Sequence, residues 1–288
     1  MSARAIAPAG RAVLRRAVFP TPRDAATVIL LRAADGAAGD GDGFEVFLLR
    51  RRKNASFMGG AFVFPGGAAD AGEDDPRVTA ARELFEEAGV LLATTPVGRE
   101  QAAALRARTL AGEPLPALLA EAGLTLDPGC LTYFSHWITP SAEPRRFSAR
   151  FFVTVLPAGQ APSFDAHETV DEAWLPPAAA LARAGELALP PPQIRTLAEL
   201  SEVRTIDAVL AMARARAAAP HPIMPRMAPL PGGGFALLLP WDPEYLSSGT
   251  GDQAPMPADH PLAVGPSRFI LEDRTWKNIA APGSTTTG

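Results

Sequence analysis

The chain has 288 residues, 47% of them hydrophobic and 20% charged, which is enough apolar material for one large globular domain or two small ones. A formal net charge of −4 argues against a broad nucleic-acid-binding surface. The single cysteine, Cys130, excludes a disulfide framework and a cysteine metal site, so a reducing compartment such as the cytoplasm is favoured. We expect Cys130 to be a small buried residue in front of a strand.

No apolar run approaches the roughly 20 residues that a membrane-spanning helix needs, so no membrane partner is expected. Residues 1–23 are rich in alanine and arginine and contain no acidic residue. That composition fits either a targeting segment or a loosely packed N-terminal arm, and the alanine content of the whole chain favours the arm.

Short β-branched and aromatic runs predict strands, and apolar residues at helical spacing predict helices. In chain order we expect strands at 26–31, 44–49 and 61–64, a helix at 76–88, a strand at 90–92, one or two helices over 98–122, strands at 131–138, 147–156 and 168–175, helices at 178–184 and 193–218, and strands at 235–239 and 268–271. A Gly- and Asp-rich loop at 35–43 joins the first two strands. Because strands and helices mingle without a strict βαβ rhythm, we predict an α/β fold with a mixed sheet covered by helices on both faces.

The helix at 76–88 carries three acidic residues that bear on function. Glu83, Glu86 and Glu87 stand at positions i, i+3 and i+4, so their carboxylates share one helix face. Their mutual repulsion would raise their pKa values unless a cation compensates, and ligands that are all oxygen favour Mg²⁺ or Mn²⁺. Taken without its flanking residues, this pattern is more typical of a solvated acidic helix face.

The flanking residues extend the pattern into a longer motif. Gly67-x5-Glu73 followed by Arg82-Glu83-Leu84-x-Glu86-Glu87-x-Gly89-Val90 resembles the Nudix box, G-x5-E-x7-R-E-U-x-E-E-x-G-U, where U is aliphatic. Eight residues separate Glu73 from Arg82, where the family has seven. Either the loop carries one extra residue or Asp74 replaces the first glutamate.

The resemblance implies a Nudix-type α/β/α sandwich and water attack on a phosphorus of a nucleoside diphosphate linked to another group. It implies that Glu83 and Glu87 bind the metal, with Glu86 as a further ligand or as the base. It also implies that Arg82 orients the glutamates, that Glu73 belongs to the catalytic set, and that the Gly67 region offers a backbone carbonyl to the metal. The metal would neutralise charge on the diphosphate and orient the water.

A narrower resemblance points to the peroxisomal coenzyme A diphosphatase branch. It is carried by Leu48-Leu49 with the three arginines that follow, Phe57-Met58-x-Gly60 leading to Gly67, Trp137-Ile138-Thr139-Pro140, Arg146-Phe147-x-x-Arg150 and Glu168-Thr169 leading to Trp174. Arginine forks suit phosphate oxygens. The implied substrate-binding residues are Arg50, Arg52, Gly66, Gly67, Arg146 and Arg150.

Other residues near these motifs have a simpler interpretation. Trp137 could stack on adenine, but a core aromatic is the better expectation. Asp165, Glu168 and Glu172 could supply a downstream ligand or base, and for each we expect a surface acid instead.

The leading hypothesis is a coenzyme A or acyl-coenzyme A diphosphatase that acts on a small-molecule nucleotide diphosphate. The alternatives are a hydrolase of ADP-ribose, NADH or another nucleotide conjugate, and a non-catalytic Nudix nucleotide sensor, which the retained carboxylates disfavour. We expect an arm at 1–23, a Nudix hydrolase domain at 24–190 and a helical and Pro-rich extension at 191–288 packed on it. The extension could complete the pocket or form a homodimer contact.

Overall fold

The computed structural model describes residues 19–34, 43–55, 58–248, 253–257 and 259–282. Most of the expected N-terminal arm, most of the 35–43 loop and Phe57 of the proposed substrate motif lie outside the described residues. None of the helices in the described ranges is long and apolar enough to cross a membrane.

The elements follow the expected order closely. The first part contains β1 (Arg23–Ala33), β2 (Phe44–Arg51), β3 (Phe62–Val63), β4 (Gly66–Ala68), α1 (Pro76–Ala88), α2 (Arg99–Leu110) and α3 (Leu115–Glu121). The middle contains a 3₁₀ turn (Pro128–Cys130), β5 (Thr132–Ile138), β6 (Phe147–Val155), β7 (Thr169–Leu175), α4 (Pro177–Ala182), α5 (Pro191–Ser201) and α6 (Ile206–Ala217). The last part contains β8 (Pro222–Ile223), β9 (Arg226–Pro229), β10 (Phe235–Leu238), β11 (Arg268–Glu272) and β12 (Thr275–Ile279).

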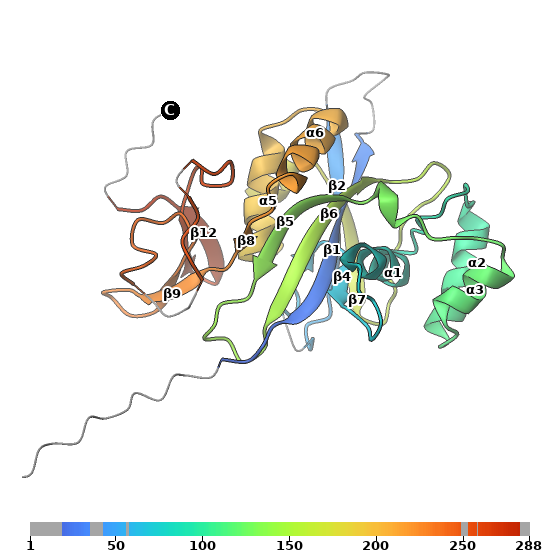
Figure 1. Ribbon diagram of the computed structural model, residues 1–288, viewed down its shortest axis with the longest axis horizontal. Coiled ribbons are helices and arrows are strands. Elements are labelled where there is room, and N and C mark those ends of the chain that lie inside the picture. Colours follow the sequence, from blue (N-terminus) through green and yellow to red (C-terminus); the bar gives the residue numbers. More distant parts are fainter. Residues whose placement is uncertain (1–18, 35–42, 56–57, 249–252, 258, 283–288) are drawn as a thin grey trace, which may run out of the picture.

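The main sheet is mixed, as predicted (Figure 1). Within the described residues its strand order is β3-β2-β1-β6-β5-β8, with β4 paired to β1 and β7 paired to β2. Strands β1 and β6 run parallel, as do β5 and β8, and the other pairs are antiparallel. The long central strand β1 therefore touches both the β4 turn and β6, which brings distant parts of the chain to one sheet face.

Alternation along β1 divides the core into two layers. Val28 and Leu30 pack with α1 on one face, while Ile29 and Leu31 pack with α5 and α6 on the other. Each of these side chains is fully buried, which stabilises the fold by roughly 1.5–3 kcal/mol per large aliphatic group. The α/β/α layering expected from the sequence is confirmed.

Two expected elements are wrong in detail. Val90–Leu92 forms no strand, because the side-chain amide of Gln160 bonds both the N–H and the carbonyl of Leu91, at 2.8 Å each, where a neighbouring strand would. The helix expected over 193–218 is two helices, since the Thr205 hydroxyl accepts a hydrogen bond from Ala208 N at 3.2 Å and starts α6 anew.

Cys130 is exposed, which contradicts the expected burial. It ends the 3₁₀ turn in front of β5, and its thiol donates to the carbonyl oxygen of Asp127 at 3.0 Å. A turn held on the surface by Asp127 and Pro128 keeps the side chain out of the core.

The C-terminal part forms a second sheet of order β12-β11-β10-β9 within the described residues. A buried ion pair between Arg268 and Asp242, 2.7 Å apart, anchors this sheet. Because α5 and α6 share the core of the main sheet, we propose that residues 191–288 are an extension packed on the domain at 24–190.

Candidate active site

Helix α1 begins and ends at well-defined caps. The Asp75 carboxylate accepts from Arg77 N at 2.9 Å, Pro76 occupies the first turn, and Gly89 closes the helix in the left-handed region at φ 72°. Leu84 and Ala88 fix the helix on the sheet. The caps and the apolar stripe therefore set the rotation of the helix and the flank from which its glutamates project.

Arg82 is the centre of the acidic cluster. Its Nε lies 2.7 Å from Glu73 Oε1, and its Nη1 lies 3.0 Å from Glu83 Oε1 and 2.9 Å from Glu86 Oε2. Its Nη2 donates to the carbonyl oxygen of Ala68 at 3.0 Å. One guanidinium thus ties the loop to two of the three helix glutamates.

Glu73 occupies the loop position next to Arg82, and Asp74 is exposed. The Glu73 carboxylate also accepts from Thr79 Oγ1 at 2.8 Å and from Asp70 N at 3.0 Å. Burial raises its pKa, but the hydrogen bonds from Arg82, Asp70 and Thr79 outweigh burial and leave the pKa below its ordinary value. The extra loop residue is therefore accommodated without replacing Glu73 by Asp74.

The other glutamates have raised pKa values. Burial raises the pKa of Glu83 to about 7 even though Arg82 opposes the shift, and it raises the pKa of Glu86 as well. Glu87 is 4% exposed, and burial together with the charge of Glu83 raises its pKa to about 8. Gly66 N donates to Glu87 Oε2 at 2.9 Å. Holding these carboxylates close together in their charged form is unfavourable in free energy, and a bound cation would offset that repulsion.

Gly66 and Gly67 bring β4 against this cluster. A Cβ on Gly67 would collide with the carboxylate of Glu83, and a Cβ on Gly66 would collide with the β1 backbone at Ala26 and Thr27. Glycine is therefore required at Gly66, where the collision is with backbone, whereas a side chain at Gly67 would displace the Glu83 carboxylate. From the sequence we expect the Gly67 region to approach a metal, but the sequence does not predict that Gly66–Ala68 pairs with β1 as a strand.

The structure separates the candidate arginines from one another. Arg50 extends over the ring of Phe62, 5.9 Å from its centroid, on the sheet face opposite α1. The Arg52 guanidinium donates to the carbonyl oxygen of Ala166 in the segment before β7. Neither is bonded to the carboxylates of α1.

Arg146 and Arg150 lie on or beside β6. Arg146 donates to the carbonyl oxygens of Thr139 at 3.1 Å and Pro20 at 2.7 Å, so it ties the start of the described chain to the β5–β6 connection. Arg150 pairs with Asp24 at 3.0 Å and lines a cavity beside the start of α1.

Two residues outside the predicted set of site residues lie near the acidic cluster. Arg51 lies close enough to Glu87 to lower its pKa, and its buried Nε has no hydrogen-bond partner among the described residues. Glu168 lies close enough to raise the pKa values of Glu83 and Glu87, although it is exposed as expected. The alternation Phe47, Leu49, Arg51 on the α1 face could have identified the arginine.

The donor set fits a hard divalent cation. The clustered side chains offer only carboxylate oxygens, and the Gly67 turn brings backbone within reach. Within the described residues no three His, Cys, Asp or Glu side chains are yet spaced to hold a metal ion, and Arg82 is bonded to three of the four carboxylates. Glu83, Glu87 and the backbone at Gly67 are the groups that could hold such a cation.

The raised pKa values predict that, once metal is chelated, the free energy of unfolding falls as the pH rises. A carboxyl whose folded pKa exceeds its unfolded value of 4.5 stabilises the fold most below pH 4.5 and loses that contribution as pH rises toward 7 and 8. We expect the free energy of unfolding in EDTA to fall by roughly 3 kcal/mol across this window. Urea melts at pH 5 and pH 8 measure it.

Glu87→Gln is the matched variant, because it keeps the shape and removes the buried charge. Its stability in EDTA should change much less with pH, and Mg²⁺ should stabilise it less than the parent chain at pH 8. Equal pH dependence in the two proteins would contradict the electrostatic account of Glu87.

Comparison with known proteins extends these observations. The model of the NUDIX domain family matches residues 21–108, which run from before β1 through the acidic cluster into α2. The chain is 32% identical over 172 residues to putative nudix hydrolase 7 of Caenorhabditis elegans, covering 56% of this chain and 57% of that protein. It is 27% identical over 279 residues to human acyl-coenzyme A diphosphatase NUDT19, covering 71% of this chain and 73% of that protein.

A solved structure shares the fold. The crystal structure of a NUDIX hydrolase from Alicyclobacillus acidocaldarius is 30% identical and matches with a TM-score of 0.58, covering 67% of this chain and 97% of that chain. The match to the C. elegans protein spans a little over half of that relative's length.

Proposed function

Because the chain belongs to the Nudix hydrolase family, we propose that it cleaves the diphosphate of coenzyme A or an acyl-coenzyme A. The products would be 3′,5′-ADP and 4′-phosphopantetheine or its acylated form. Nudix hydrolases act on nucleoside diphosphate substrates, and the acidic cluster around Arg82 is the observation that carries this chemistry here. The choice of coenzyme A is supported by the names of two relatives, both acyl-coenzyme A diphosphatases at 25% and 27% identity.

In the proposed reaction a water oxygen bonds to a phosphorus of the diphosphate, the bond from that phosphorus to the bridging oxygen breaks, and a base accepts the water proton. Glu83, Glu87 and the backbone at Gly67 would hold Mg²⁺ or Mn²⁺, which neutralises charge on the diphosphate. Arg82 holds Glu73 and Glu86 in place through bonds of 2.7 and 2.9 Å.

Two residues are candidates for the base. Glu86 is a helix glutamate with a raised pKa, which favours proton acceptance near neutral pH. Glu168 is exposed at the start of β7 and lies close to Glu83 and Glu87. Asp165 orders this segment, since its Oδ1 accepts from Glu168 N and Thr169 N, both at 2.9 Å.

Arg51 is the strongest candidate among the arginines for the diphosphate itself. It shares the α1 side of the sheet with the carboxylates, and its guanidinium has no ion pair among the described residues. A guanidinium fork matches the oxygens of adjacent phosphates. We therefore propose Arg51, in place of Arg50, as the phosphate-binding residue of this cluster.

Arg51→Gln should raise KM for the diphosphate substrate about 10-fold or more, because one charge-assisted hydrogen bond contributes about 1.5–3 kcal/mol. Steady-state kinetics with saturating Mg²⁺ measures it. Arg108→Gln is the matched control, since its ion pairs with Glu113 and Glu121 lie on the exposed surface of α2 and α3. An unchanged KM in Arg51→Gln would remove this residue from the binding site.

The substrate proposal is tested by the products formed from a panel of diphosphates. The full chain is incubated with Mg²⁺ or Mn²⁺ and coenzyme A, acetyl-coenzyme A, ADP-ribose or NADH, and the products are identified by mass spectrometry. We expect 3′,5′-ADP from the first two. Cleavage confined to ADP-ribose or NADH would overturn the coenzyme A proposal, and no cleavage of any diphosphate would favour a nucleotide sensor.

A further inference from the structure

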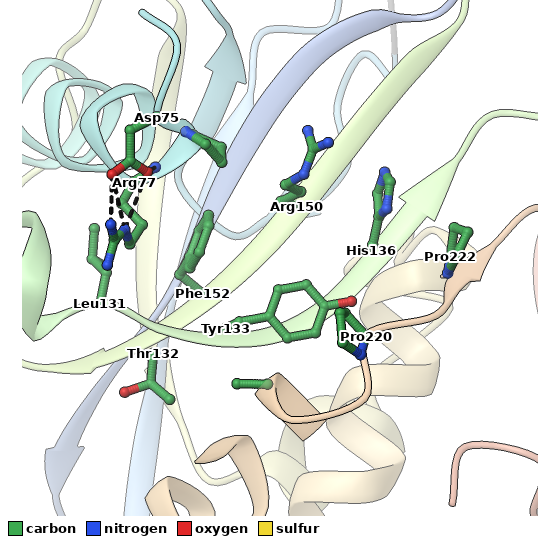
Figure 2. Close-up of a pocket in the computed structure, with 12 residues that line it drawn as sticks. Asp75, Arg77, Leu131, Thr132, Tyr133, His136, Arg150, Phe152, Pro220 and Pro222 are labelled. Carbon is green, nitrogen blue, oxygen red and sulfur yellow. Dashed lines mark hydrogen bonds and ion pairs between the residues drawn. The ribbon is translucent and has the colours of Figure 1, made fainter. Parts of the chain in front are cut away.

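A cavity of about 610 Å³ lies beside the start of α1, on the sheet face that α1 covers (Figure 2). Tyr133 and His136 of β5 line it together with Arg150 and Phe152 of β6, and Pro220 from the segment after α6 lines it as well. Its volume falls in the range of small-molecule sites.

The cavity borders the catalytic loop. Arg150 pairs with Ala26 across β6 and β1, and Ala26 pairs with Gly67 across β1 and β4, so Arg150 and Gly67 are two strands apart in one row. Two strand spacings are roughly 10 Å. The loop between β4 and α1 lies beside this row, since Ala69 N donates to the carbonyl oxygen of Asp24 at 2.9 Å, and Asp24 pairs with Arg150.

The lining combines flat apolar surface with a few directed polar groups. The rings of Tyr133 and Phe152 meet edge to face, with centroids 6.4 Å apart. Tyr133 Oη is buried and has no hydrogen-bond partner within the described part of the chain. Burial raises the pKa of Tyr133 to about 12, so the hydroxyl stays a donor at neutral pH.

His136 completes the polar side of the cavity. Burial, with the nearby charge of Arg150, lowers the pKa of His136 to about 4, so its ring is neutral at physiological pH. Its Nε2 shares a hydrogen bond with Ser148 Oγ at 2.9 Å. The cavity thus suits a planar, uncharged ring that presents a hydrogen-bond acceptor, with a guanidinium at its edge.

We propose that this cavity holds the nucleobase of the diphosphate substrate while the diphosphate lies at the acidic cluster. The inference rests on the proposed hydrolase function, because it assigns the second end of the same substrate. A nucleobase offers ring faces to Tyr133 and Phe152 and acceptors to the unpaired Tyr133 hydroxyl. An acyl chain offers that hydroxyl no acceptor. A pantetheine chain has amide carbonyls that could accept from it, but it has no flat ring to place against Tyr133 and Phe152, so both chains fit the lining less well than a nucleobase.

Adenosine is the probe, because it carries the base without phosphates and so needs no metal. Calorimetry on the full chain in EDTA should detect adenosine binding, weakened ~10-fold or more in Tyr133→Ala and less in Tyr133→Phe, which keeps the ring. With coenzyme A and Mg²⁺, Tyr133→Ala should raise KM ~10-fold and change kcat less than about twofold. Leu246→Ala, exposed in the C-terminal part, is the control.

The outcomes separate the two proposals. Adenosine that fails to bind the parent chain, or that binds Tyr133→Ala and Tyr133→Phe as well as the parent, overturns the cavity assignment, and this holds whether or not the chain cleaves diphosphates. Glu87→Gln should bind adenosine normally. If the chain binds adenosine as expected but cleaves no diphosphate, the nucleobase site is supported and the proposed hydrolase activity is overturned.

Discussion

Glu87→Gln is expected to lower kcat by roughly 10²- to 10⁴-fold while the chain keeps its fold, and Glu86→Gln is expected to do the same. Glu87 is 4% exposed and faces Gly66 at 2.9 Å, so the change removes a buried charge at the proposed metal site with almost no change in volume. Glutamine keeps the contact to Gly66 N but neither binds a hard cation strongly nor accepts a proton.

The measurement is steady-state turnover with coenzyme A at saturating Mg²⁺, with circular dichroism to confirm the fold. Glu113→Gln is the matched control, because this glutamate pairs with Arg108 on the exposed surface of α2 and α3. Its kcat should stay within about twofold of the parent chain. Undiminished turnover in both Glu86→Gln and Glu87→Gln would remove the acidic cluster from catalysis.

The helix of the site was the part most open to prediction from sequence. Its caps at Asp75 and Gly89, its apolar stripe and its three glutamates are all local, with periodicity and spacing sufficient to place them on one flank. The mixed sheet of the Nudix-type fold is confirmed as well, because the order of strands and helices along the chain predicts it, and each of those elements has a local signal.

The rest of the site depends on pairings between distant segments. Glu168 reaches the cluster because β7 pairs with β2, and the carbonyl of Glu168 accepts from Arg52 N at 3.0 Å. No local pattern around residue 168 contains that information. The resemblance likewise implies Arg50 and Arg52 as substrate-binding residues, although strand alternation turns Arg50 and Arg51 to opposite faces and brings Arg51 to the side of the carboxylates.

The cavity beside α1 could not be predicted from the sequence, because the residues that line it come from distant segments of the chain. Its walls come from α1, β5, β6 and the segment after α6, so Pro220 and Tyr133 line one cavity only once these distant segments have packed together. Trp137 is the core side chain that the sequence favours, 5% exposed on the opposite face. The two aromatic side chains of β5 point to opposite faces of the sheet, and Tyr133 is the one that lines the cavity.

Arg82→Met is expected to destabilise the chain by roughly 3 kcal/mol at pH 8 in EDTA and to lower kcat at least about 10-fold in Mg²⁺. The Arg82 side chain is 13% exposed and neutralises Glu73, Glu83 and Glu86 over bonds of 2.7–3.0 Å. Methionine fills part of the same volume but leaves these carboxylates without their cation. Removing one partner of a buried ion pair lowers stability by more than the intact pair contributes, because the other charge stays buried and unpaired.

The double variant Arg82→Met with Glu73→Gln separates charge from packing. If unpaired charge causes the loss, removing the Glu73 charge should recover part of the stability, and Mg²⁺ should stabilise Arg82→Met more than it stabilises the parent chain. Urea melts with and without Mg²⁺ measure both effects. A stability equal to the parent in Arg82→Met would show that the glutamates do not depend on this arginine, and the loop at Glu73 would then have to be held by Thr79 and Asp70 alone.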